Sequence, residues 1–304
     1  MSATNAANGT SDSRTVLVTG ATTGIGKHVA LDLAKRGYRV FATGRNAKAL
    51  DALRAEATAR GTTLITVALD VTDQASIDEA AAVVKRENGG RGIDVLVNNA
   101  GYGQGGPSLE LDDATLRKQF DTNVFGLMAV TRAFAPEMVA RGAGWIVNVS
   151  SIGGRVTFPF FGAYHASKYA LEALSDALRV ELRPFGVRVV LVEPGPITSE
   201  FSERAFTSLP QGKAAARYAS TYNRAGGIRA ASDRFSFGPE HVALAVRRAM
   251  GNRPSARYMA PSLLGLMFAL MPFVPTRMLD LLFGWVFGFG RAAPRALEGE
   301  PAKR

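Results

Sequence analysis

The chain has 304 residues, which is long enough to bury a sizeable core in one large α/β domain or two small ones. Its residues are 47% apolar and 20% charged, and 32 are glycine, a composition typical of a soluble globular protein and not of a disordered or fibrous one. The net charge is +10 at pH 7, and there is no cysteine, which excludes disulfides, thiolate nucleophiles and cysteine metal sites.

The first 13 residues, MSATNAANGTSDS, are small and polar and lack an apolar run after a basic start. We therefore expect a disordered tail rather than a signal peptide, and a cytoplasmic protein. The three histidines, His28, His165 and His241, are far apart and show no HExxH-type spacing. We therefore expect no metal site.

Residues 14–200 alternate apolar, strand-like runs with longer helical patterns. The strand-like runs are residues 14–20, 38–44, 63–70, 93–101, 144–151 and 187–195. The helical patterns are residues 25–37, 46–61, 74–88, 112–141 and 163–183. The strand runs are apolar at nearly every position, as in a parallel sheet covered by helices on both faces. The alternation predicts right-handed crossovers and an α/β fold with a doubly wound, Rossmann-like parallel sheet.

The pattern changes after Pro196. Residues 197–238 are rich in aromatic residues, serine and arginine, and we expect them to form a substrate lid. A helix at 239–250 and a short strand at 256–260 follow. The predicted units are a tail (1–13), a Rossmann-like domain (14–260), an apolar C-terminal extension (261–290) and a polar tail (291–304).

The positive charge is concentrated near the C-terminus. Residues 201–304 contain 15 basic and 6 acidic residues, a balance of +9, whereas residues 1–200 contain 21 and 20. A solvated arginine-rich surface, an anionic membrane surface and an anionic substrate each fit this distribution. We expect no nucleic-acid binding, because there is neither a dense Lys/Arg run nor a known nucleic-acid motif.

The stretch VLVTGATTGIGKHVA places Gly20, Gly24 and Gly26 between the first strand and the first helix. Glycines there let backbone amides approach a pyrophosphate, and the helix N-terminus adds a positive dipole. The spacing is GxxxGxG rather than GxGxxG, and His28 stands where a Walker A loop needs Ser or Thr. A plain tight turn also fits the glycines, but the strand–helix context favours a dinucleotide site.

The end of the second strand reads Thr43-Gly44-Arg45, without the carboxylate that usually binds the ribose hydroxyls of NAD. An arginine there can pair with a 2′-phosphate. A surface arginine that opens the next helix is the alternative interpretation. We expect the cofactor to be NADP(H) rather than NAD(H).

Seven motifs appear in order: TGATTGIG, LDVTD, NNAG, Asn123 in DTNVFG, IVNVSS, YHASK and EPGPITSEF. Together they resemble the short-chain dehydrogenase/reductase family in its compact single-domain form, and its hydroxysteroid and retinol dehydrogenase-like members in particular. The resemblance covers residues 14–200 well and 239–260 loosely. It implies an oxidoreductase that acts on CH–OH groups.

The resemblance implies catalytic roles for Asn123, Ser151, Tyr164 and Lys168. The cofactor-binding residues that it implies are Gly20, Thr22, Thr23, Gly24, Ile25, Gly26, Arg45, Asp70, Val71, Asn99, Ala100, Gly101, Tyr164, Lys168, Pro194, Gly195, Ile197 and Thr198. In this assignment Asp70 and Val71 flank the adenine, residues 99–101 line the adenosine side, and Ile197 and Thr198 hold the nicotinamide amide.

Tyr164 and Lys168 stand four residues apart and therefore share one face of a helix. A tyrosine with a pKa near 10 is a poor acid at pH 7, but an ammonium within about 4–6 Å, together with a positive nicotinamide, lowers that pKa. Tyr164 can then protonate a carbonyl oxygen while Ser151 hydrogen-bonds it. Lys168 can also hold ribose hydroxyls, and Asn123 can position a water that resupplies the proton. The alternative is plain packing, with Tyr164 and Lys168 on a partly exposed helix face and Ser151 and Asn123 as helix caps.

The apolar stretch 261–290 is interrupted by prolines and charges, and neither of its runs approaches the ~18 residues of a spanning helix. It fits a wall of the substrate cleft or a subunit contact. Joined to the local positive charge, it also fits peripheral contact with an anionic membrane surface. We also expect the protein to form a homo-oligomer.

We expect an NADP(H)-dependent enzyme that interconverts a ketone or aldehyde and an alcohol on an apolar substrate such as a lipid, steroid or retinoid-like molecule. A 3-oxoacyl-thioester reductase is a second enzyme hypothesis. A catalytically idle NADP-binding sensor or scaffold is an alternative from another class, against which the four intact site residues argue.

Overall fold

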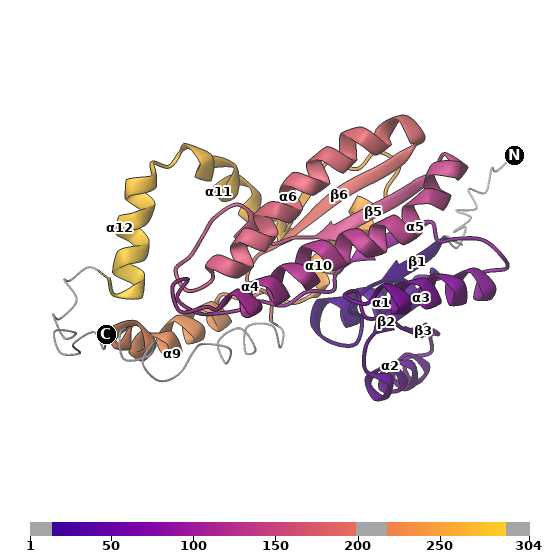
Figure 1. The fold of residues 1–304 in the computed structure, drawn as a ribbon, viewed down its shortest axis with the longest axis horizontal. Helices are drawn as coiled ribbons and strands as arrows, with labels where there is room; N and C mark the ends of the chain where they lie inside the picture. The colour runs from indigo at the N-terminus through magenta and orange to yellow at the C-terminus, as the bar shows by residue number, and fades with distance from the viewer. Residues whose placement is uncertain (1–13, 199–217, 290–304) are drawn as a thin grey trace, which may run out of the picture.

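The computed structural model describes residues 14–198 and 218–289 (Figure 1). The predicted tails, and residues 199–217 of the predicted lid, lie outside the described residues. Within the two described ranges, no helix is both long and apolar enough to cross a membrane.

Seven parallel strands form one sheet in the order β3-β2-β1-β4-β5-β6-β7, which confirms the predicted doubly wound fold. Their bounds are β1 (Thr15–Val18), β2 (Arg39–Gly44), β3 (Ile65–Ala68), β4 (Val95–Asn98), β5 (Gly144–Val149), β6 (Val187–Pro194) and β7 (Arg257–Ala260). Because the strands are parallel, their carboxyl ends lie along one edge of the sheet, where open α/β sheets bind ligands.

Helices cover both faces of the sheet. The helices of the described residues are α1 (Gly24–Lys35), α2 (Ala47–Ala59), α3 (Gln74–Glu87), α4 (Asp113–Phe120), α5 (Leu127–Arg141), α6 (Gly162–Leu182), α9 (Ala219–Arg234), α10 (Glu240–Ala249), α11 (Gly265–Leu270) and α12 (Thr276–Phe287). The predicted helix over 112–141 exists but contains a π-helical segment, η1 (Asp121–Gly126), between α4 and α5.

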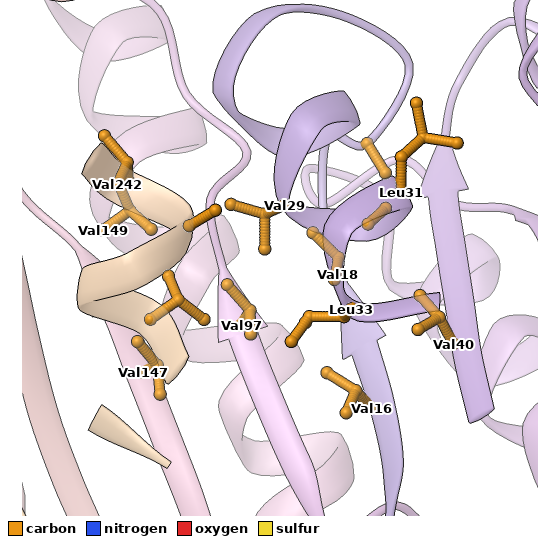
Figure 2. Close-up of a cluster of buried hydrophobic side chains, with 14 of the residues drawn as sticks. Val16, Val18, Val29, Leu31, Leu33, Val40, Val97, Val147, Val149 and Val242 are labelled. Atoms are coloured by element: carbon orange, nitrogen blue, oxygen red, sulfur yellow. The ribbon is translucent and has the colours of Figure 1, made fainter. Parts of the chain in front are cut away.

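The two faces of the sheet bury separate apolar layers. Val16 and Val18 of β1 join the layer under α1 and α10, whereas Leu17 between them joins the layer under α3 and α5. Figure 2 shows the first layer, where Val29 of α1 and Val242 of α10 meet valines of the central strands. Burial on both sides explains why these strands are apolar at every position.

The apolar C-terminal stretch forms α11 and α12, joined by the short 3₁₀ segment η5 (Met271–Phe273). Figure 1 shows α9, α11 and α12 at one end of the molecule, away from α1, α2 and α3. α12 contacts α9, and the Arg224 guanidinium donates a hydrogen bond to the Trp285 carbonyl oxygen at 3.3 Å. The segment after Pro261 is therefore an arm that packs against α9 and the loop at 158–161, and not an added layer of the sheet.

Candidate active site

The residues of the predicted site gather at the carboxyl edge of the central strands. Gly20 follows β1, Asn99 follows β4, Ser151 follows β5 and Gly195 follows β6. These strands are neighbours in the sheet, so motifs as much as 175 residues apart in sequence end side by side. This location was predicted from the sequence pattern, and the strand order explains it.

The turn from β1 to α1 leaves no space for side chains. Gly20 has a φ of +63°, and a Cβ there would lie 2.9 Å from the Ala100 Cα. A Cβ on Gly26 would collide with the Gly20 carbonyl oxygen and the Asn99 side-chain amide. Glycine is therefore required at both positions, and the backbone stays open to a ligand.

Two polar side chains brace this turn against the end of β4. The Thr19 hydroxyl accepts hydrogen bonds from the amides of Asn99 and Ala100, both at 2.9 Å. The Asn99 Nδ2 donates to the Thr19 carbonyl at 2.9 Å and the Gly20 carbonyl at 3.2 Å. The loop after β4 and the glycine turn therefore form one rigid unit.

The N-terminus of α1 fits the pyrophosphate of a dinucleotide. Thr23 occupies the N-cap position without a side-chain capping bond, and the first turn of α1 contains no acidic residue. A cavity of about 250 Å³ lies beside it, with Gly24, Lys27 and Thr198 in its lining. Uncapped amides and the helix dipole favour an anion there, whereas Lys27 is already paired with Glu56 of the same lining at 3.2 Å.

Arg45 lies just beyond β2, with its side chain 73% exposed. Its guanidinium is 3.8 Å from the Asp70 carboxylate, a loose ion pair that leaves it accessible to a phosphate. Burial tends to raise the pKa of Asp70, but hydrogen bonds from Thr72 and the charge of Arg45 outweigh it and lower the pKa. Asp70 is therefore a charged carboxylate at neutral pH, beside the predicted adenine position.

Ser151, Tyr164 and Lys168 converge at the end of β5. The Ser151 hydroxyl is hydrogen-bonded to the Tyr164 phenol. The Lys168 ammonium lies 5.9 Å from the centre of the Tyr164 ring and donates to the Val149 carbonyl at 2.9 Å. Tyr164 and Lys168 are both buried, so simple placement on an exposed helix face is wrong for these two residues.

In the protein without cofactor the pKa of Tyr164 is raised, so its lowering by the Lys168 ammonium together with a positive nicotinamide stays a prediction. Burial raises the pKa of Tyr164 to about 12, and the hydrogen bond from Ser151 offsets this only in part. Burial also lowers the pKa of Lys168 to about 8, because a low-dielectric environment disfavours the ammonium of Lys168 as it does the phenolate of Tyr164. At neutral pH the phenol is therefore protonated and the lysine is mostly charged.

Glu172 is the acidic neighbour of Lys168, one helical turn further along α6. Its charge partly restores the pKa of Lys168 against burial. Burial, and then the charge of Glu193, raise the pKa of Glu172 itself to about 7. The Arg257 Nε lies 3.3 Å from the Glu172 carboxylate and 3.2 Å from that of Glu193.

Asn123 lies in the π-helical segment and is fully buried. Its Nδ2 donates to the Tyr102 carbonyl and to the Ser167 hydroxyl, both at 3.0 Å, and its Oδ1 accepts from the Tyr102 amide at 3.1 Å. The side chain therefore holds the loop after β4 against α6. A role for Asn123 in positioning a water stays a prediction.

Ile197 and Thr198 lie beyond β6 and pair with residues that precede α10. The Ile197 side chain packs in the core, and the Thr198 amide donates to the Phe237 carbonyl at 2.9 Å. The Thr198 hydroxyl lies 2.7 Å from that of Ser236. The two residues are thus fixed near the glycine turn, while their contact with the nicotinamide stays a prediction.

Aromatic side chains gather beside Tyr164. The loop at 158–161 meets α9 and α12 there, through Phe158, Phe160, Tyr218, Tyr222, Phe283, Phe287 and Phe289. Phe160 has a φ of +68°, which a bulky residue rarely adopts, and its ring stacks on Phe289 at 5.9 Å. The described part of the predicted lid therefore lies against the loop that precedes the candidate acid.

Sequence reasoning missed Thr19, Ser167 and Glu172. Ser167 receives the Asn123 amide and donates to the Tyr164 carbonyl at 2.7 Å. The spacing of Ser167 and Glu172, three residues after Tyr164 and four after Lys168, was a usable signal because such positions share a helix face. Thr19 gave no such signal, since its partners lie 80 residues away.

Comparison with known proteins agrees with this geometry. The family model described as short chain dehydrogenase matches residues 14–209. A Streptomyces avermitilis short-chain dehydrogenase of known structure superposes with a TM-score of 0.72, at 34% identity, over 92% of this chain and 99% of that one. The chain belongs to the short-chain dehydrogenase family and is an oxidoreductase.

Two curated relatives carry names that bear on the chemistry. An NADPH-dependent 3-dehydrocapnine reductase of Ornithobacterium rhinotracheale is 35% identical, covering 89% of this chain and 96% of the relative. The 17-beta-hydroxysteroid dehydrogenase type 1 of Homo sapiens is 41% identical, covering 64% of this chain and 60% of the relative. The predicted similarity to hydroxysteroid dehydrogenases is thus confirmed.

Proposed function

We propose that the protein is an NADP(H)-dependent reductase of ketones or aldehydes that acts on an apolar substrate, with Tyr164 as the proton donor. The observation that carries the proposal is the buried Tyr164 phenol, hydrogen-bonded to Ser151 and lying beside the Lys168 ammonium. These groups stand at the sheet edge next to a turn that fits a dinucleotide.

The nicotinamide, when bound, supplies the hydride for reduction or accepts it from an alcohol. Tyr164 donates its proton to the carbonyl oxygen as negative charge develops there. The Ser151 hydroxyl hydrogen-bonds the same oxygen, and the Lys168 charge stabilises the phenolate that remains. Asn123 keeps α6 and the loop after β4 at a fixed separation through its bonds to Ser167 and Tyr102.

Arg45 supports the preference for NADP(H). It stands at the end of β2, is largely exposed, and has only a loose ion pair to give up for a 2′-phosphate. The name of the relative from Ornithobacterium rhinotracheale states NADPH dependence. Arg45 would hold the phosphate, and the turn around Gly26 would hold the pyrophosphate.

The aromatic side chains where the loop at 158–161 meets α9 and α12, which we call the aromatic wall, support an apolar substrate. Phe160 lies between rings of α9 and α12, close to Tyr164 in the chain. A steroid, as in the name of the human relative, has the rigid apolar surface that such a wall accepts. The basic C-terminal third instead suits an anionic 3-oxoacyl thioester, which is the second candidate function.

The test combines a substrate screen with one variant. NADPH oxidation is followed with steroid, retinoid and long-chain ketones, with acetoacetyl thioesters and, as a cofactor control, with NADH. We expect turnover of the apolar ketones, and in Tyr164→Phe a loss of at least 1,000-fold in kcat with unchanged NADPH binding. Preference for thioesters would favour the second candidate. NADPH binding without any turnover would favour an idle sensor or scaffold, and a few-fold effect of Tyr164→Phe would refute the assignment of the acid.

A further inference from the structure

Helix α12 has one face that belongs to the protein interior. Phe283 meets the Phe158 ring edge-on at 5.2 Å, and Phe287 is buried and stacks on Phe160 at 6.3 Å. The Phe287 carbonyl accepts a hydrogen bond from the Thr221 hydroxyl of α9 at 2.8 Å. This face fixes α12 on the loop that precedes Tyr164.

The opposite side of α12 is also apolar, but it faces solvent. Met278, Leu281, Leu282 and Trp285 are 60%, 75%, 50% and 75% exposed. Their spacing is i, i+3, i+4 and i+7, so they form one stripe along the helix. Large apolar side chains gathered in this way, rather than scattered singly, mark an interaction surface.

The stripe is continued by the residues that lead into α12. Leu263, Leu270 and Phe273 are 66%, 56% and 82% exposed. Together these seven side chains define what we call the apolar arm, which lies at one end of the molecule (Figure 1). Burial of each such side chain contributes about 1.5–3 kcal/mol of favourable free energy. Burial of the apolar arm would therefore favour binding strongly.

The described residues of α9 and α12 carry a small excess of exposed positive charge. Arg277 on α12, and Arg224 and Arg234 on α9, are exposed, whereas the exposed acidic residues of these helices are Asp233 and Asp280. Over residues 201–304 the sequence balance is +9. A surface that is apolar, basic and about one helix wide matches an anionic lipid interface, where arginines meet headgroups and Trp and Leu enter the acyl boundary.

We propose that the apolar arm docks the protein on the surface of an anionic lipid bilayer, with α12 lying in the plane of the interface. The α12 stripe, from Met278 to Trp285, is about 11 Å long and about 10 Å wide. Two such stripes would bury far less than the roughly 1,200 Å² of a stable dimer, and the shared positive charge would oppose their pairing. Binding to an anionic bilayer needs no minimum interface area of this kind, and the bilayer carries the opposite charge.

The test is vesicle flotation of the full chain. Phosphatidylcholine vesicles with and without 30% phosphatidylglycerol are used, at about 0.1 M and 0.5 M NaCl. The variant Leu281→Glu/Trp285→Glu removes two members of the stripe. Val180→Glu is the matched control, because Val180 is 64% exposed on α6 outside the arm. NADPH binding and thermal unfolding report whether each variant is folded.

We expect the wild type to float with the phosphatidylglycerol vesicles and to bind them at least tenfold more weakly at high salt. The double variant should lose at least tenfold in binding, while Val180→Glu binds like the wild type. Three results would overturn the proposal: a wild type that stays off the vesicles, a double variant that binds equally well, or a wild-type dimer that the double variant converts to monomers. Vesicle flotation measures neither NADPH binding nor ketone turnover in solution. A negative flotation result would therefore not contradict the proposed function.

Discussion

Burial determines the ionisation of the groups around Tyr164. With a Tyr164 pKa of about 12 and a Lys168 pKa of about 8, the protein at neutral pH presents a neutral proton donor beside an ammonium. Reduction of a carbonyl needs that state, whereas oxidation of an alcohol needs the phenolate. Under the proposed function, these groups therefore suit reduction of a carbonyl near neutral pH.

Glu172→Gln tests the electrostatic support of Lys168. The Glu172 charge raises the pKa of Lys168, so its removal should lower that pKa below about 8. We expect the alkaline decline of kcat/KM for ketone reduction to begin at lower pH in this variant. Glu181→Gln is the control, since Glu181 is exposed on the same helix. Coincident pH profiles for Glu172→Gln and the wild type would contradict the prediction.

Arg45→Ala tests the cofactor preference. Under the proposed function, loss of the guanidinium removes the group that would hold the 2′-phosphate but no contact that NADH needs. We expect the KM for NADPH to rise about tenfold or more and that for NADH to stay within about twofold. Arg54→Ala, at an exposed position on α2, serves as the comparison. An equal rise for both cofactors would mean that Arg45 acts on the fold and not on the phosphate.

At the scale of secondary-structure elements, the candidate site depends on the turn between β1 and α1, which the loop after β4 holds in place. Gly26→Ala would push a Cβ against the Gly20 carbonyl and the Asn99 amide, so the turn must open. We expect the Kd for NADPH, measured by fluorescence titration, to rise at least tenfold.

The matched control for Gly26→Ala is Gly227→Ala on α9. A Cβ at Gly227 meets nothing within 4 Å, so this substitution should leave NADPH binding unchanged. It should also stabilise α9 slightly, because alanine favours helix by about 1 kcal/mol over glycine. Unchanged NADPH affinity in Gly26→Ala would show that the turn does not hold the pyrophosphate.

The sequence predicted the strands and most helices because local patterns carry them. Val95–Val97 is buried on both faces and apolar throughout, and Gly37 and Gly186 close their elements with positive φ. The π-helical segment was not predictable, since it accompanies bonds from Asn123 to a loop 21 residues away. α9 was also missed, because its residues show no clear apolar period.

At the scale of the whole molecule, His165 links the loop before α6 to the stability of the fold. It is buried, its Nδ1 accepts from the Phe158 amide at 3.0 Å, and burial lowers its pKa to about 4 from 6.5. Protonation would remove the acceptor. Because the folded pKa lies below the unfolded one, the stabilisation is complete above about pH 6.5 and is lost as the pH falls through about 4.

We therefore expect the stability difference between the wild type and His165→Gln to shrink as the pH falls from 7 towards 4. The change should be on the order of 3 kcal/mol over that range. Urea unfolding at several pH values measures it. A difference that stays constant with pH would show that His165 is not a buried neutral acceptor.

The site as a whole was only partly readable from the sequence. Motif order identified Ser151, Tyr164 and Lys168, whose convergence the structure shows, but the direction of the Tyr164 pKa shift depends on burial, which spacing does not reveal. Composition located the positive charge and the apolar stretch at 261–290. It could not show that one face of α12 packs inward while the other is exposed, because that depends on α9 and the loop at 158–161.

The strand order also has a consequence for synthesis on the ribosome. β1 lies inside the sheet between β2 and β4, and its turn to α1 is braced by Asn99, 80 residues after Thr19. The predicted adenosine half of the site, around this turn, is therefore translated before Ser151, Tyr164 and the predicted nicotinamide contacts Ile197 and Thr198. A cofactor that binds this half would stabilise it by mass action while the second half is still emerging. Availability of the cofactor in the cell would then influence the yield of folded enzyme as well as its rate.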